Sequence, residues 1–174
     1  LNSVGHRVVV FERDARPGGI LRYGIPDFKL EKWVLDRRLK LLEAEGIEFV
    51  THATVGTDYP AASLRKAFDA VCVAVGCRVP RDLPIEGRGL HGIHFAMDYL
   101  AQSNRRVAGE DVAAPQLIDA RDKRVVVLGG GDTGADCVGT ANRQGAARVT
   151  QLEILPKPPA TRQPRDLWPD WPTI

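Results

Sequence analysis

The stretch RVVVLGGGDTGADC, residues 124–137, decides the fold, because an apolar β-branched run passes directly into three consecutive glycines and then into a helix-like segment. Gly129, Gly131 and Gly134 fit the spacing GxGxxG. In that pattern the first glycine permits a tight turn, the second lets the backbone approach a pyrophosphate, and the third lets the helix pack on the strand. The free N–H groups and positive end of the helix would face the phosphates. The stretch predicts nucleotide binding, with a plain glycine turn as the alternative.

An acidic residue follows this turn at the distance expected of a ribose ligand. Glu153 closes the run VTQLE, about 20 residues after the glycines. A carboxylate there accepts the ribose hydroxyls and repels a 2′-phosphate, which favours NADH over NADPH. Lys157 and Arg162 follow closely and could pair with such a phosphate, so both nucleotides stay open. An edge-strand glutamate in water is the alternative interpretation.

The start of the chain repeats part of this pattern. Glu12 closes VVVFE as Glu153 closes VTQLE, so residues 1–12 are interpreted as the back half of a second mononucleotide-binding unit, with its ribose on Glu12. Gly18 and Gly19 would let the backbone approach that ligand, or would simply form a turn. The sequence starts without methionine and ends in a proline-rich loop, so it is interpreted as a fragment of a longer protein.

Strands alternating with helices predict an α/β fold with two Rossmann-like lobes, each with a parallel sheet and each truncated. Residues 7–12 contain a continuous β-branched run, as expected of a strand buried on both faces, and the apolar run 70–76 is predicted to be another buried strand. The lobes are expected at 1–78 and 79–174, around a hinge rich in proline and glycine. Further strands are predicted at 47–51, 124–128 and 148–154, and helices at 31–44, 62–68, 94–105 and 132–145.

Composition argues against several classes of partner. The 174 residues carry a net charge of +2, with basic residues scattered along the chain, so neither nucleic acid nor an anionic membrane is expected. No apolar run approaches the roughly 18 residues of a bilayer span. The three cysteines form no CxxC pair, which favours a reducing, cytoplasmic location and no metal site. Cys72 and Cys137 are expected to be core thiols.

Longer segments carry a family resemblance. The segments are ERDARPGG (12–19), LRYGIPDFKLEKWVLDRR (21–38), AVG (74–76), PRDLPI (80–85), HFAMDYL (94–100), GGGDTGADC (129–137), QLEILPKPP (151–159) and WPDWP (168–172). Together they resemble the small (beta) subunit of glutamate synthase. Related modules occur in dihydropyrimidine dehydrogenase and in ferredoxin:NADP oxidoreductases of the same type. The resemblance implies an FAD domain interrupted by an NAD(P)H domain, and electrons passed to a large (alpha) subunit that makes two glutamates from glutamine and 2-oxoglutarate.

The resemblance also implies roles for single residues. Those expected near FAD are Glu12, Gly18, Gly19, Leu21 and Arg22, and Gly76 marks the crossover to the NAD(P)H domain. Those that match the pyridine nucleotide loop are Gly129, Gly131, Asp132, Thr133, Gly134 and Asp136, with Glu153 and Lys157 after the next strand. Because hydride passes from nicotinamide C4 to flavin N5 between stacked rings, no catalytic residue is expected.

The sequence departs from the family pattern in what it lacks. The first FAD glycine motif, the cysteines of two iron–sulfur clusters and the C-terminal flavin motif are absent from these 174 residues. Iron–sulfur clusters are therefore expected only in a missing N-terminal region. The segment LEILPKPP looks more like the NADH-linked form than the arginine-rich one. Two alternatives stay open: an inactive nucleotide-binding fragment, and a reductase module of a ferredoxin- or pyrimidine-linked enzyme.

Overall fold

The structure, a computed structural model, describes residues 1–113, 117–157 and 159–161. The chain divides into two compact units, Leu1–Ile118 and Asp119–Ile174. The lobes predicted at 1–78 and 79–174 are defined by the ligand that each would hold, and this division stays a prediction. None of the described helices is both long and apolar enough to span a bilayer.

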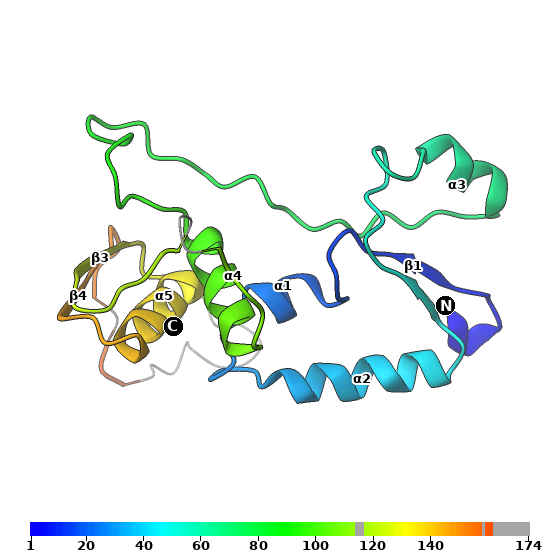
Figure 1. The fold of residues 1–174 in the computed structure, drawn as a ribbon, viewed down its shortest axis with the longest axis horizontal. Helices are drawn as coiled ribbons and strands as arrows, with labels where there is room; N and C mark the ends of the chain where they lie inside the picture. Colours follow the sequence, from blue (N-terminus) through cyan, green and yellow to red (C-terminus); the bar gives the residue numbers. More distant parts are fainter. Residues whose placement is uncertain (114–116, 158, 162–174) are drawn as a thin grey trace. The chain divides into compact units, whose positions relative to one another are not determined.

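The first unit is built on a parallel pair of strands. After the short 3₁₀ turn η1 (Asn2–Val4), β1 (Val9–Phe11) pairs with β2 (Glu48–Val50), so the predicted strands form at both places (Figure 1). Their connection contains the expected amphipathic helix α2 (Lys32–Ala44) and a short helix that the sequence pattern did not predict, α1 (Gly19–Tyr23).

Two further helices complete the first unit. They are α3 (Ala61–Ala67), which follows Pro60, and α4 (Ala96–Val107). Within α4, Leu100 is only 1% exposed, and the Nδ2 group of Asn104 donates to the carbonyl oxygens of Tyr23 and Ile25, both at 3.1 Å. A buried amide with both bonds satisfied fixes α4 against the end of α1. The buried apolar side chains of the unit are Tyr23, Leu35, Ala53, Leu64, Tyr99 and Leu100.

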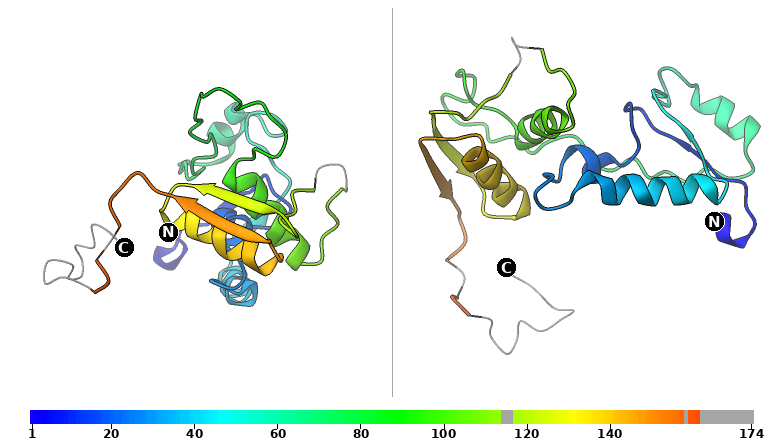
Figure 2. Two further views of the ribbon diagram at one scale, coloured as in Figure 1. Left: turned by 90° about the vertical axis from the view of Figure 1, so that its left-hand side faces the viewer. Right: turned by 60° about the horizontal axis from the view of Figure 1, so that its bottom comes forward.

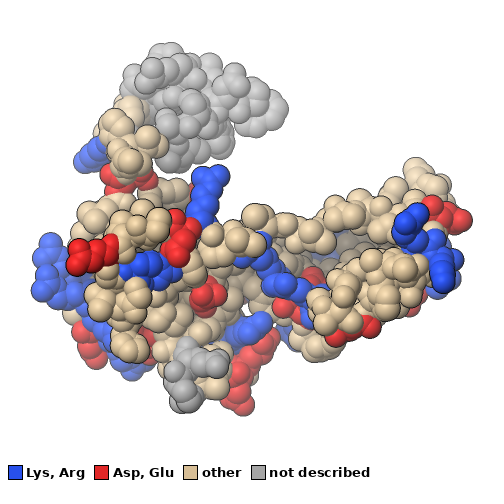
Figure 3. Space-filling model, turned by 90° about the horizontal axis from the view of Figure 1, so that it is seen from above, with Lys and Arg blue, Asp and Glu red and all other residues tan. Residues whose placement is uncertain are grey.

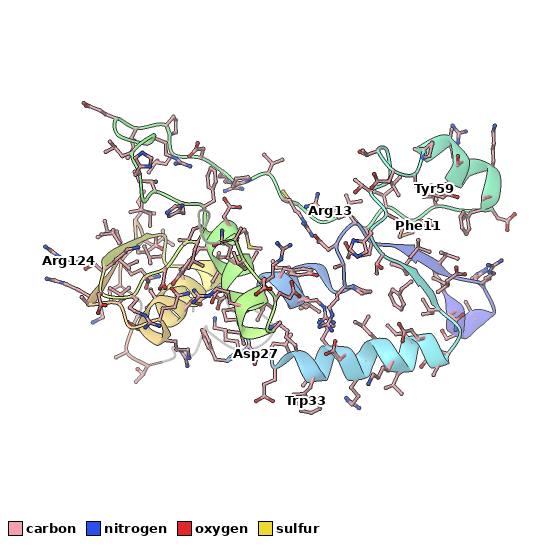
Figure 4. All side chains as sticks on the ribbon, viewed as in Figure 1. Phe11, Arg13, Asp27, Trp33, Tyr59 and Arg124 are labelled. Atoms are coloured by element: carbon pink, nitrogen blue, oxygen red, sulfur yellow. The ribbon has the colours of Figure 1, made fainter. Side chains whose placement is uncertain are left out.

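The aromatic contact at the end of β1 ties that strand to the segment before α3. Phe11 and Tyr59 point toward one another in Figure 4, with ring centroids 4.8 Å apart, and Phe68 packs edge-on against Phe11 at 6.0 Å. Tilted and edge-on geometries of this kind are the favoured arrangements of aromatic pairs. They cover one side of β1, where Val9 and Phe11 are half-buried, whereas Val10 on its other side is 37% exposed, so the prediction of burial on both faces was wrong for this strand.

The prediction of a strand at 70–76 is also wrong. These residues form no strand and are exposed; Val73 is 77% and Val75 80% exposed, and Cys72 is exposed rather than a core thiol. Apolar sequence indicates burial only where a neighbouring strand and a covering layer exist. The described residues supply neither of them here.

The described part of the second unit is built on one strand–helix–strand element. β3 (Arg124–Leu128) and β4 (Arg148–Leu152) pair in parallel and in register, Arg124 opposite Arg148 and Leu128 opposite Leu152. The helix α5 (Asp132–Arg143) lies along one face of this pair (Figure 2). Val127, Cys137 and Ala141 are buried there, whereas Val126 is 60% exposed on the opposite face. The predicted strands and helix all form, and α5 and β4 end two residues earlier than expected.

Candidate functional site

The glycine turn connects β3 to α5 with three residues. Gly129 has φ 108, which L side chains rarely adopt, and Gly131 is the N-cap of α5 with φ −72 and ψ −176. The N–H of Gly129 donates to the carbonyl oxygen of Leu152 at 2.8 Å, which closes the strand ladder at the turn. Position 129 therefore requires glycine for its backbone angle alone.

The third glycine of the motif is required by packing. A Cβ on Gly134 would lie 2.2 Å from the carbonyl oxygen of Gly129 and 3.1 Å from its carbonyl carbon. The first turn of α5 can therefore lie against the end of β3 only without a side chain at this position. This is the close packing of helix and strand expected for the last glycine of the motif.

The second glycine borders open space. A Cβ on Gly131 would have no atom within 4 Å. The N-cap residue of α5 is Gly131, no side chain within the described part of the chain caps this end, and Asp132 and Thr133 in the first turn are exposed. The first N–H groups of a helix lack partners inside the helix and attract anions. The turn thus offers uncapped donors beside an unfilled space, which suits a phosphate group.

The side chain of Glu153 reaches back to this turn. Its Oε2 accepts a hydrogen bond from the N–H of Gly130, and its Oε1 accepts from Ile154 at 2.6 Å and Leu155 at 3.0 Å. The N–H of Leu155, followed by those of Gly130 and Ile154, lowers the pKa of the carboxyl group, which is ionised at neutral pH. A carboxylate has about four acceptor positions, so about one is left for a ribose hydroxyl.

Gln151 also contacts the turn and was missed by the sequence analysis. Its Nε2 donates to the carbonyl oxygen of Gly129 at 2.8 Å. The sequence could have indicated this contact, because Gln151 lies two residues before Glu153 at the end of a predicted strand. Side chains at i and i+2 of a strand point to the same side. Gln151 and Glu153 therefore both reach the turn.

The remaining predicted residues of this unit differ in their exposure. Asp136 is 7% exposed and lies on the buried side of α5 beside Cys137. Burial, and secondarily the charge of Asp136, raises the pKa of the Cys137 thiol to about 11, so this cysteine is an unreactive core thiol as expected. Lys157 is described and exposed. Arg162 and the segment WPDWP lie outside the described residues.

In the first unit Glu12 shows the same local turn as Glu153. Its Oε1 accepts from the N–H of Asp14 at 3.0 Å, two residues on, as Oε1 of Glu153 accepts from Leu155. Both glutamates follow a parallel strand, at the edge of the sheet where α/β proteins bind ligands. The two predicted ribose ligands therefore share a local turn and a place after a parallel strand, and Glu153 alone also binds the glycine turn.

The other residues predicted near FAD have structural contacts of their own. Gly18 caps α1 with φ 129, and a Cβ there would lie 2.7 Å from Cδ2 of Leu35; Gly19 borders open space. The Arg22 side chain is 7% exposed, its Nε donating to the Pro17 carbonyl oxygen at 2.7 Å and its Nη2 to Asp36 Oδ1 at 2.5 Å. Leu21 is 42% exposed. Arg22 is therefore committed to structural contacts, whereas Gly19 and Leu21 are the more open residues of this segment.

Gly76, the predicted crossover residue, ends the exposed run 70–76 and has φ 67. Among the residues that the structure describes, no three His, Cys, Asp or Glu side chains cluster as metal ligands do. Acidic and basic side chains are interspersed over the face drawn in Figure 3.

Comparisons with known proteins agree with this geometry. A sequence model of the family described as pyridine nucleotide-disulphide oxidoreductase matches residues 5–165. A glutamate synthase [NADPH] small chain from Mycobacterium tuberculosis is 51% identical over 177 residues, covering 100% of this chain and 36% of the relative. That of Bacillus subtilis is 49% identical, covering 100% and 35%, and the glutamate synthase [NADH] of Schizosaccharomyces pombe is 47% identical, covering 100% and 8%. The resemblance stated from the sequence is confirmed.

A solved structure supports the fold. FprA from Mycobacterium tuberculosis, in complex with NADPH, superposes with a TM-score of 0.66 at 23% identity, covering 83% of this chain and 36% of that one. The predicted α/β class with Rossmann-like, parallel strand pairs is confirmed. The chain spans about a third of the length of the bacterial glutamate synthase small chains that it matches.

Proposed function

The chain belongs to the pyridine nucleotide-disulphide oxidoreductase family, and from that premise we propose that it forms part of a glutamate synthase small subunit, which passes hydride from NAD(P)H to FAD. The observation that carries the proposal is the glycine turn, where Gly134 lies against the Gly129 carbonyl and Gly131 borders open space before an uncapped helix. Three backbone features that a pyrophosphate site needs thus occur together.

The turn residues would hold the pyridine nucleotide by its phosphates. Gly131 lets the pyrophosphate approach the backbone, and the first N–H groups of α5, at Asp132, Thr133 and Gly134, would donate to it. Glu153 would accept a ribose hydroxyl with its remaining lone pair. Asp136 supports the helix from its buried side, and Lys157 would lie near the adenosine end.

FAD would be held by the first unit. Glu12 would bind its ribose, the backbone at Gly18, Gly19, Leu21 and Arg22 would pass near the flavin, and Gly76 would mark the crossover between an FAD lobe at 1–78 and an NAD(P)H lobe at 79–174. The fit rests on Glu12, whose carboxylate follows a parallel strand. When bound, the nicotinamide supplies a hydride at C4 and FAD accepts it at N5. The residues of this chain would bind and orient the two groups, and we expect no acid or base among them.

The wider assembly belongs to the same proposal. Electrons would pass on to a glutamate-forming large subunit through iron–sulfur clusters held by other parts of the protein. A cytoplasmic location fits the three cysteines, none of which is in a disulphide. The relatives from Mycobacterium tuberculosis and Bacillus subtilis are named as NADPH enzymes, and the relative from Schizosaccharomyces pombe is named as an NADH enzyme. The nucleotide is therefore proposed as NAD(P)H.

The test is a reductive titration of the full-length protein. Under anaerobic conditions, NADH or NADPH is added in steps while the visible absorption of the flavin is followed. Bleaching by at least one nucleotide is expected. A protein that contains FAD but is bleached by neither nucleotide would contradict the proposal, and so would a protein that binds no FAD.

A further inference from the structure

Two side chains hold one peptide group in the glycine turn. The carbonyl oxygen of Gly129 and the N–H of Gly130 belong to the same peptide group. The carbonyl accepts from Nε2 of Gln151 at 2.8 Å, and the N–H donates to Oε2 of Glu153. Both polar ends of this peptide group are therefore bound by side chains at the end of β4.

A peptide group between two glycines needs such support. Neither neighbour has a Cβ, so rotation of the group about its flanking bonds meets little steric resistance. The preceding backbone contact, from the N–H of Gly129 to the carbonyl of Leu152, fixes only the entrance of the turn. The carbonyl of the next peptide group packs against Gly134 of α5, and Gln151 and Glu153 supply the side-chain hydrogen bonds to its two polar ends.

The charges make this support directional. A carboxylate accepts hydrogen bonds and cannot donate them, so Glu153 binds the N–H side of the peptide and repels its carbonyl side. The glycines leave room for both side chains. A Cβ on Gly130 would lie 2.2 Å from Oε2 of Glu153, and a Cβ on Gly134 would lie 3.0 Å from Nε2 of Gln151.

We propose that Gln151 and Glu153 are positioning residues, which together fix the Gly129–Gly130 peptide group and so keep the glycine turn shaped for a pyridine nucleotide. The expected effect on nucleotide binding rests on the proposed function. For Glu153 it adds a second role to the ribose contact. For Gln151 it assigns a role that needs no contact with the nucleotide.

Loss of a positioning residue should affect nucleotide binding differently from loss of a ribose ligand. A loosened turn weakens the shared pyrophosphate contact, so replacement of Gln151 raises KM for NADH and NADPH by the same factor. One hydrogen bond of this kind corresponds to a factor of about three to ten. The effect falls on KM rather than on kcat, because the nicotinamide and flavin rings are not touched.

The experiment compares Gln151→Met with Gln144→Met in the full-length protein. Gln144 also uses its side-chain oxygen to bind a backbone group, accepting from the N–H of Ala120 at 2.9 Å, but it lies away from the turn. Gln151→Met is expected to raise both KM values equally, and Gln144→Met to leave them unchanged. Equal effects of the two variants, or an effect of Gln151→Met on one nucleotide only, would overturn the inference.

A second measurement needs no nucleotide. Hydrogen exchange of the peptide that covers Gly130 is followed in the unliganded protein, for Gln151→Met, for Glu153→Ala and for Gly130→Ala. Each is expected to speed exchange at the turn, the last because its methyl group displaces the Glu153 carboxylate. Unchanged exchange in all three would overturn the inference. If the unaltered protein binds no pyridine nucleotide, the proposed function fails while the exchange result still decides how the peptide is held.

Discussion

The carbonyl oxygen of Gly129 lies 2.2 Å from the point that a Cβ on Gly134 would occupy. The obstacle is backbone at the end of β3 and not a flexible side chain. A Gly134→Ala substitution must therefore push α5 away from the sheet. We expect a loss of about 1–3 kcal/mol in the free energy of unfolding of this unit, the usual cost of overpacking. Denaturant unfolding with matched m-values checks this, and an unchanged midpoint would contradict the observed packing.

Gly131→Ala should behave in the opposite way. The added methyl group meets no atom within 4 Å and the φ of −72 suits alanine, so only the weaker N-cap preference of alanine should lower the stability, by about 1 kcal/mol or less. The methyl group would stand where the pyrophosphate approaches, and KM for the nucleotide should rise at least about tenfold. Steady-state kinetics with both nucleotides provides the measurement. Unaltered KM values would show that no ligand approaches the backbone at Gly131.

Glu153→Ala tests nucleotide choice. Loss of the carboxylate removes a ribose acceptor and also a negative charge that repels a 2′-phosphate. We expect the ratio of kcat/KM for NADPH over NADH to rise by about tenfold or more. The loosened turn should lower kcat/KM for both nucleotides by the same factor, so this effect cancels in the ratio. A ratio that does not change would remove Glu153 from the ribose site.

The same carboxylate gives a pH dependence. Its hydrogen bonds to the N–H groups of Leu155, Gly130 and Ile154 lower its pKa below the usual 4.5. A carboxyl group with a depressed folded-state pKa stabilises the fold above its unfolded-state pKa and loses that contribution as the pH falls through the folded value. The stability difference between the original protein and Glu153→Gln should therefore be constant at neutral pH and shrink below about pH 4.5. Unfolding curves between pH 3 and 7 check the trend, and a difference that grows in acid would contradict it.

Arg22 should matter for stability far more than a surface arginine. Arg22→Met removes hydrogen bonds to the Pro17 carbonyl and to Asp36 from a guanidinium that is 7% exposed, which should cost about 1.5–3 kcal/mol. Arg7 offers the matched control, because its ion pair with Glu48 joins side chains that are 82% and 55% exposed. Arg7→Met should cost less than about 1 kcal/mol. Similar losses in the two variants would contradict a structural role of Arg22 between α1 and α2.

The cysteines should differ in reactivity. Cys72 and Cys77 are exposed, whereas Cys137 is buried and its thiol has a pKa raised to about 11. A maleimide at pH 7.5 should label the first two rapidly and Cys137 only after denaturation. Peptide mapping by mass spectrometry gives the labelled positions. Rapid labelling of Cys137 in the folded protein would show that α5 opens readily.

Local patterns predicted most of the elements. The β-branched runs before Glu12 and before Gly129 form strands, and residues 31–44, with their helical spacing of apolar side chains, form α2. Each of these patterns depends only on neighbouring residues in the sequence. The short helix α1 was not predicted, since the pair Gly18–Gly19 reads as a turn. The strand expected at 70–76 failed for a different reason. Its apolar residues need a partner strand, and sequence alone does not report whether one is present.

By itself the sequence determined the glycine turn, its place between a strand and a helix, and the glutamate that follows the next strand, because spacing along one chain dictates these features. Only the tertiary structure decided what each residue contacts. It committed the Arg22 guanidinium to Asp36, turned the Glu153 carboxylate onto the N–H of Gly130, and brought Gln151 to the Gly129 carbonyl. Such contacts depend on the parallel register of β3 with β4 and on the packing of α1 against α2. Hydrogen bonds form between groups that the fold brings within about 3 Å, whatever their separation in the sequence.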